Sequence, residues 1–71
     1  MAEVKISLAA ARVNACMTQD EVAQALQVNK ATIISWEKGR TKIPFVSLIQ
    51  LCELYEFPID NIFLPSELTK S

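Results

Sequence analysis

Apolar residues recur along most of the chain at the three- and four-residue steps of amphipathic helices, interrupted by capping and helix-breaking residues. This pattern predicts five helical segments: 7–14, 18–26, 30–38, a fourth from Pro44 to the break at 57–58, and a short last turn at 60–63. The best strand candidate, residues 32–34, lies inside the third helical segment. We therefore expect an all-α fold, a compact bundle of five short helices.

The expected helix boundaries carry typical capping residues. Thr18 and Glu21 have the spacing of a capping box, in which the hydroxyl and the carboxylate each accept a hydrogen bond from a backbone N–H. Asn29 is a favoured N-cap residue, and Gly39 is placed to end the third helix in a left-handed conformation. Only residues 27–28 separate the second helix from the third, so we expect these two helices to cross at a steep angle.

Length and composition restrict the function. The 71 residues are enough for one domain over 1–71, with a core at about 7–64 between a short flexible N-terminal arm and a flexible C-terminal tail. There is no histidine. Cys16 and Cys52 are far apart in the sequence, so we read them as unpaired, buried small hydrophobic residues, with a disulfide as the alternative. We expect no metal, no cofactor, no small-molecule ligand and no enzymatic activity.

Two kinds of targeting segment are not found in the sequence. Glu3 and Arg12 do not fit the charge pattern of a signal peptide. No segment approaches the roughly 20 apolar residues that cross a membrane. These observations favour a cytoplasmic protein that makes no membrane contact.

The charge is unevenly distributed, although the net charge is only −1. Segment 28–42 holds four basic residues against Glu37, whereas segment 44–71 holds four acidic residues against Lys70. One end of the molecule is thus suited to face phosphate while the other faces water. Ordinary scatter of charge along the chain is the alternative.

The third helical segment has two different faces. Ile33 and Trp36 lie three residues apart and continue the apolar line from Val28, so we expect them to face inward. The opposite face then carries Lys30, Ala31, Ile34, Ser35 and Lys38. A helix of this size with short side chains fits the major groove of DNA, where its N-terminal residues meet base edges first. A solvated face that touches nothing is the alternative, and Ile34 is either half-buried or a contact for a thymine methyl.

Residues 18–40, TQDEVAQALQVNKATIISWEKGR, closely resemble the Cro/cI-type helix-turn-helix family, also called the Xre family. The resemblance rests on the TQ-x-E start, the hydrophobic-polar pair between the helices and the sequence I-x-x-W-E-x-G-R, and with the later apolar spacing it covers about 7–64. It implies a lambda-repressor-like fold and a transcriptional regulator that reads double-stranded DNA. A repressor acting as a homodimer on a pseudo-palindromic operator is the favoured form.

The resemblance also implies roles for individual residues. The positions that match base-reading residues are Lys30, Ala31, Thr32, Ile34 and Ser35, of which Thr32 alternatively touches phosphate. The positions that match phosphate-binding residues are Gln19, Asn29, Lys38, Arg40 and Lys42. As alternatives, the first two of these are only helix caps, and the last three are solvated loop charges. Arg12 matches an arginine that pairs with the glutamate at position 37, and we expect this ion pair to fix the first helix against the third.

Three positions depart from the family pattern. Gln27 and Cys16 stand where the family often has glycine, and Pro44 lies one position later than the usual proline. If Gln27 has a positive φ angle, its side chain adds a strain of about 1 kcal/mol.

The last predicted turn carries more apolar residues than a small core needs. We expect part of this set, Ile59, Phe63 and Leu64, to form the dimer contact, while Ile62 is also available to the core. The same fold also serves as a protein-interaction module in antitoxins and coactivators. The near-neutral charge and the apolar C-terminal part suit that alternative.

Overall fold

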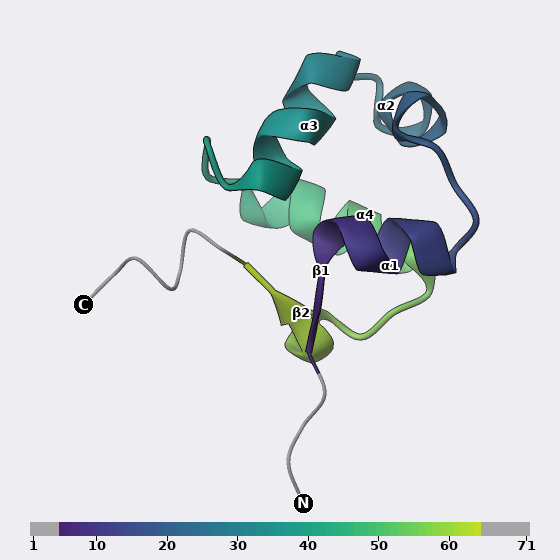
Figure 1. Ribbon diagram of the computed structural model, residues 1–71, viewed down its shortest axis with the longest axis vertical. Coiled ribbons are helices and arrows are strands. Elements are labelled where there is room, and N and C mark those ends of the chain that lie inside the picture. Colours follow the sequence, from purple (N-terminus) through teal and green to yellow (C-terminus); the bar gives the residue numbers. More distant parts are fainter. Residues whose placement is uncertain (1–4, 65–71) are drawn as a thin grey trace, which may run out of the picture.

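A computed structural model describes residues 5–64 of the chain. Within this range the elements follow the order β1 (Ile6–Ser7), α1 (Leu8–Asn14), α2 (Gln19–Leu26), α3 (Lys30–Lys38), α4 (Phe45–Tyr55), the 3-10 helix η1 (Ile59–Asn61) and β2 (Ile62–Phe63). Figure 1 shows α2 and α3 at one end of the molecule and the two short strands at the other. The bounds of the first three helices agree with those expected from the sequence.

The helices begin at four different kinds of cap. The hydroxyl of Ser7 accepts a hydrogen bond from the N–H of Ala10 at 3.0 Å. Thr18 and Glu21 form the complete capping box that their spacing predicts. Asn29 has the extended backbone of an N-cap, but its side chain makes no capping hydrogen bond. Pro44 precedes α4 without a side-chain cap, because its ring has no hydrogen-bonding group, although its backbone carbonyl accepts from the N–H of Leu48 at 2.9 Å.

All four α-helices in the described range end in the same hydrogen-bonded turn. In each turn, a residue one or two positions after the helix has a positive φ angle, and two backbone N–H groups return to carbonyls of the last helical turn. The four left-handed residues are Cys16 (φ 60°), Gln27 (φ 58°), Gly39 (φ 73°) and Glu56 (φ 54°). The expected left-handed end at Gly39 is confirmed, and Gln27 adopts the strained conformation considered above.

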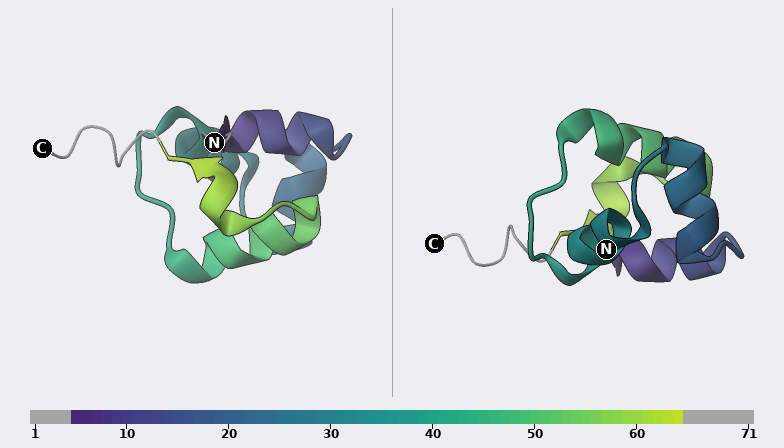
Figure 2. Two further views of the ribbon diagram at one scale, coloured as in Figure 1. Left: turned by 90° about the horizontal axis from the view of Figure 1, so that it is seen from below. Right: turned by 90° about the horizontal axis from the view of Figure 1, so that it is seen from above.

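One hydrophobic core joins the helices. Leu8 and Ala11 of α1, Val22 of α2 and Ile33 of α3 are almost completely buried, and Leu51 of α4 lies among them. Small side chains let the helices approach one another, and α2 packs most closely against α3. In Figure 2, α1 and α4 lie on opposite sides, with the η1–β2 segment between them.

The expected fifth helix is absent from residues 5–64, so the prediction of five helices is wrong. Residues 59–61 form one 3-10 turn, and the chain then extends into β2. β2 pairs in parallel with β1, with Ile6 opposite Ile62 and Ser7 opposite Phe63. The short apolar run that contains β2 fits a helix and a strand equally well from its sequence alone. Its partner, β1, lies at the other end of the sequence, so local patterns did not reveal the pairing. The helical fold class is otherwise as expected.

Three further expectations concern the chain as a whole. Both cysteines are free, and no disulfide joins them. The expected burial is confirmed for Cys52 and wrong for Cys16, which lies exposed in the turn after α1. No helix in the described part of the chain is long and apolar enough to cross a membrane. The expected flexible arm and tail fall largely on residues 1–4 and 65–71, outside the described residues.

Candidate nucleic-acid interface

The orientation of α3 follows from the tight turn that precedes it. The N–H of Val28 donates to the carbonyl of Ala23 at 3.0 Å, which closes the end of α2 and directs the chain at once into α3. Ile33 and Trp36 are then buried against the core, as their spacing predicts. The remaining face of α3 points away from the core at one end of the molecule, in the position drawn uppermost in Figure 1.

The five positions expected to read bases are all accessible to some degree. Lys30 and Ala31 are exposed, whereas Thr32, Ile34 and Ser35 are half-buried. The hydroxyl of Thr41 donates to Ser35 Oγ at 3.2 Å, so it ties the loop after α3 to the helix. Ser35 accepts in this bond and keeps its own hydrogen for a further acceptor.

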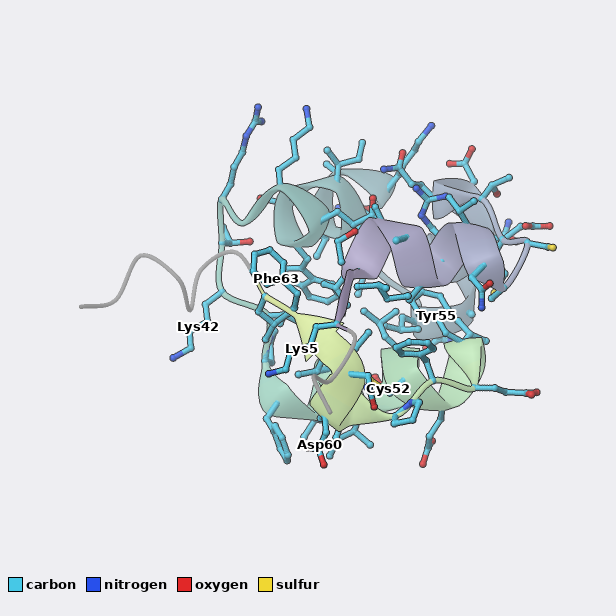
Figure 3. The ribbon with its side chains drawn as sticks, turned by 60° about the horizontal axis from the view of Figure 1, so that its bottom comes forward. Lys5, Lys42, Cys52, Tyr55, Asp60 and Phe63 are labelled. Carbon is cyan, nitrogen blue, oxygen red and sulfur yellow. The ribbon has the colours of Figure 1, made fainter. Side chains whose placement is uncertain are left out.

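Three exposed cations follow one another through the end of α3 and the loop behind it. Lys38, Arg40 and Lys42 are all exposed. The N–H of Arg40 donates to the carbonyl of Ser35 at 2.9 Å, which fixes the course of the loop against the helix. Figure 3 shows Lys42 pointing outward on the side of the molecule away from Tyr55. These cations form a positive border beside the accessible face of α3.

Glu37 is the acidic residue in this basic segment, and it does not weaken the positive border because it is partly buried and paired. Arg12 Nε donates to Glu37 Oε2 at 2.7 Å, and the exposed fraction of the glutamate side chain is only 7%. Arg12 Nη1 also donates to the carbonyl of Met17 at 3.0 Å. The hydrogen bond with Glu37 raises the pKa of Arg12 above its ordinary value. The expected pairing is therefore present, and it joins α1 to α3.

The two expected phosphate contacts at helix starts differ from each other. Gln19 Nε2 donates to Glu37 Oε1 at 2.9 Å, so its carboxamide is turned toward the ion pair. The carboxamide of Gln19 retains its second amide hydrogen for binding an anion. The unpaired backbone N–H groups in the first turn of α2 are also available. Asn29 is exposed at the N-cap position of α3, and its side chain makes no capping hydrogen bond.

Sequence analysis missed an acidic residue beside the first expected base-reading residue. Lys30 Nζ lies 3.6 Å from Asp20 Oδ2, in an ion pair between the first turns of α3 and α2. Both side chains are largely accessible, with exposed fractions of 51% for Lys30 and 72% for Asp20. Asp20 was visible in the sequence only as a helix-start residue, and nothing in local spacing placed it near Lys30.

The expected dimer contacts lie at the opposite end from the start of α3. Ile59, Phe63 and Leu64 are half-buried, while Ile62 is part of the core. Ile59 and Leu64 share a surface hollow with Phe45, Lys5 and Asp60. Figure 3 shows Lys5 near the strands, Phe63 above it and Asp60 below it.

Exposed apolar residues on α4 were also missed. Phe45 and Val46 have exposed fractions of 67% each, and Ile49 has 37%. The signal was present in the sequence, since α4 carries apolar residues on more of its circumference than one buried face requires. Among the described residues, no three potential ligand side chains gather in a way that fits a metal ion.

Comparison with known proteins agrees with this geometry. No curated protein and no solved structure matches the chain significantly. The sequence model of a family described as Helix-turn-helix, HTH_3, matches residues 8–62, which is most of the chain. HTH_3 is a family of DNA-binding regulatory domains of the Cro/cI type, so the resemblance inferred from residues 18–40 is confirmed. The matched range extends from α1 to the start of β2, and the chain belongs to this helix-turn-helix family.

Proposed function

We propose that this protein is a sequence-specific regulator of transcription that reads double-stranded DNA with α3 in the major groove. The observation that carries the proposal is the accessible face of α3 beside a continuous border of three cations. An α-helix fits the width of the major groove, and base contacts there distinguish all four base pairs. Cations beside the groove attract the phosphates on either side of it.

The interface divides into two kinds of contact. Lys30, Ala31, Thr32, Ile34 and Ser35 face the base edges, with Lys30 at the N-terminal end that enters the groove first. Lys38, Arg40 and Lys42 bind phosphates together with Asn29 and the first turn of α2, including Gln19. Phosphate contacts set affinity and register, whereas base contacts set the choice of sequence.

The partly buried ion pair between Arg12 and Glu37 supports the proposed base-reading helix. Glu37 accepts hydrogen bonds from Arg12 and Gln19, so one carboxylate connects all three of the first helices. Such a network holds the angle between α2 and α3, and this angle decides where the base-reading side chains lie. Arg12 and Glu37 therefore position the interface without touching DNA.

One short helix reads few base pairs, so the proposal includes a homodimer on a pseudo-palindromic operator with half-sites about one helical turn apart, roughly 34 Å. The surface proposed for the dimer contact is the hollow with Ile59 and Leu64, together with Phe63, and it extends to the exposed Phe45. A repressor is the simplest form, since a bound dimer blocks access to the DNA that it covers.

Selection from a random duplex library at physiological salt, followed by sequencing, tests the proposal directly. We expect a two-fold-related motif whose half-sites are one turn apart, and a binding constant that falls as salt increases. Enrichment of no motif, together with the absence of binding at low salt, contradicts the proposal.

A protein-interaction module of the same fold is the second candidate. The observation that favours it is the exposed apolar set on α4, Phe45, Val46 and Ile49, which lies outside α3. This candidate predicts that the protein binds no duplex DNA with a salt-dependent constant. The library experiment therefore separates the two functions.

A further inference from the structure

The ion pair between Lys30 and Asp20 is the one charged contact on the proposed DNA-binding surface that the proposed function leaves unexplained. Within residues 5–64, two ion pairs form, the partly buried pair of Arg12 with Glu37 and this exposed one. The carboxylate lies in the first turn of α2, next to the backbone N–H groups that favour an anion. An acidic side chain at this place repels the phosphates that the same surface is proposed to bind.

We infer that Asp20 is a specificity-determining positioning residue, which holds Lys30 away from phosphate so that its ammonium reads a base edge. The inference rests on the proposed function. Lysine is a flexible point charge that binds any phosphate within its reach, and such contacts carry no sequence information. A carboxylate 3.6 Å from Nζ gives the ammonium an alternative partner at the start of α3.

The geometry allows the Lys30–Asp20 ion pair to form in the free protein and to separate when Lys30 reaches a base. Both side chains are more than half exposed, and the pair spans two helices whose packing fixes their backbones. An exposed ion pair contributes little to stability, so it does not block Lys30 from donating to guanine O6 or N7. It is sufficient to disfavour non-specific contacts, because an ammonium group that is paired with Asp20 is less available to the phosphates within its reach.

The carboxylate also has a structural effect that must be separated from this role. An acidic side chain in the first turn of a helix stabilises α2 through the helix dipole, with or without Lys30. A purely structural role changes the unfolding free energy and the amount of active protein. It leaves the ratio between specific and random-sequence affinity unchanged.

The test compares Asp20→Asn, Asp20→Glu, Lys30→Ala and the double variant Asp20→Asn with Lys30→Ala. For each protein, the dissociation constant is measured on the selected duplex and on a random-sequence duplex over a range of salt. Glu56→Gln serves as a charge-matched control, because Glu56 is exposed at the end of α4 and lies outside both α3 and the hollow proposed for the dimer contact.

We expect Asp20→Asn to bind random duplex more tightly, with a salt dependence steeper by about one phosphate contact. The ratio of specific to random-sequence affinity should fall about two- to fivefold, the range of one exposed ion pair. The fall should disappear when Lys30 is already alanine, and Asp20→Glu should retain most of the wild-type ratio. Glu56→Gln should leave the ratio unchanged.

Two results overturn the inference while leaving the proposed function intact. One is an equal change in specific and random-sequence affinity for Asp20→Asn. The other is a fall in the ratio that persists in the Lys30→Ala background. If the wild-type protein binds no duplex at all, the proposed function and this inference fail together.

Discussion

Each of the four α-helices is followed within two residues by a residue in the left-handed region, and only Gly39 among these is a glycine. A side chain in this conformation crowds the neighbouring carbonyl and adds strain of about 1 kcal/mol. Cys16, Gln27 and Glu56 therefore each hold a conformation that glycine adopts with less strain. The strain is maintained because the backbone hydrogen bonds of each turn and the packing that follows it both require this conformation.

Replacing Gln27 with glycine should stabilise the protein. The expected increase in unfolding free energy is about 0.5–1 kcal/mol, because relief of the left-handed strain exceeds the added freedom of the unfolded chain. Urea denaturation measures the change. Gln24→Gly is the matched control, since Gln24 is exposed inside α2, and there glycine should destabilise by about 1 kcal/mol. Equal destabilisation by both variants contradicts the assignment of strain to position 27.

Tyr55 should make the protein sensitive to alkali. Burial raises the pKa of this phenol from 10.0 to about 12, so between these values the unfolded chain releases a proton that the folded protein keeps. The associated stability is fully present below about pH 10 and is lost as the pH rises to about 12. Tyr55→Phe should lose stability less steeply over this range in urea titrations at pH 8 and pH 11. An equal loss of stability in the wild type and in Tyr55→Phe contradicts the prediction. Burial also raises the pKa of Cys52, but this effect is the same in both proteins.

At the scale of elements, α2 and α3 work as one unit. The tight turn at residues 27–28 sets their crossing, and the contacts of Glu37 hold it. α3 then presents one face to the core and leaves the other accessible, while the loop after it carries cations. The proposed division between a base-reading helix and a phosphate-binding loop predicts that substitutions in the two parts have different effects on DNA binding.

Lys30→Ala and Arg40→Ala should separate base choice from general affinity. Lys30→Ala should flatten the preference at one or two base pairs, each by about 1–3 kcal/mol. Arg40→Ala should weaken binding to all sequences alike and reduce the salt slope by about one. Library selection with each variant measures both effects. An unchanged preference for Lys30→Ala removes this residue from the proposed base readers.

At the scale of the whole molecule, the described part of the chain has two surfaces of different character. The accessible face of α3 and the basic loop form one, and the start of α4 forms the other with its exposed apolar residues. Apolar exposure of this kind on a small domain marks an interaction surface. The hollow that contains Phe45, Ile59 and Leu64 continues this surface toward the C-terminal end of the described chain.

Phe45→Glu should abolish the proposed homodimer without unfolding the monomer. Phe45 is already two-thirds exposed, so a charged side chain adds little strain to the fold, but it places a like charge opposite its copy in a symmetric contact. Sedimentation equilibrium and circular dichroism measure assembly and folding. The expected result is a folded monomer with weaker operator binding, and Phe63→Glu should act in the same direction.

Val13→Glu provides the matched control for this prediction. Val13 on α1 is an apolar residue with an exposed fraction of 63%, close to that of Phe45, and it lies outside the hollow. The same charge there should leave assembly unchanged. A folded dimer in both Phe45→Glu and Phe63→Glu would exclude this surface as the dimer contact.

Local sequence determined the helices and their ends. Periodic apolar residues defined the first three helices, the capping box at Thr18 and Glu21 formed as its spacing predicts, and Gly39 ended α3. The inward positions of Ile33 and Trp36 also followed from spacing alone. These features depend on contacts within a few residues, so the neighbouring sequence contains all the information that they need.

Only the tertiary structure decided the contacts between distant segments. The pairing of Ile6 with Ile62 replaced the expected fifth helix, Gln19 turned to Glu37, and Asp20 came to lie beside Lys30. In each case, local propensity allows several conformations of similar free energy, and the choice among them depends on which distant group packing brings within reach. The sequence thus specified the helices and the accessible face of α3, whereas packing between helices decided which charges and strands meet around them.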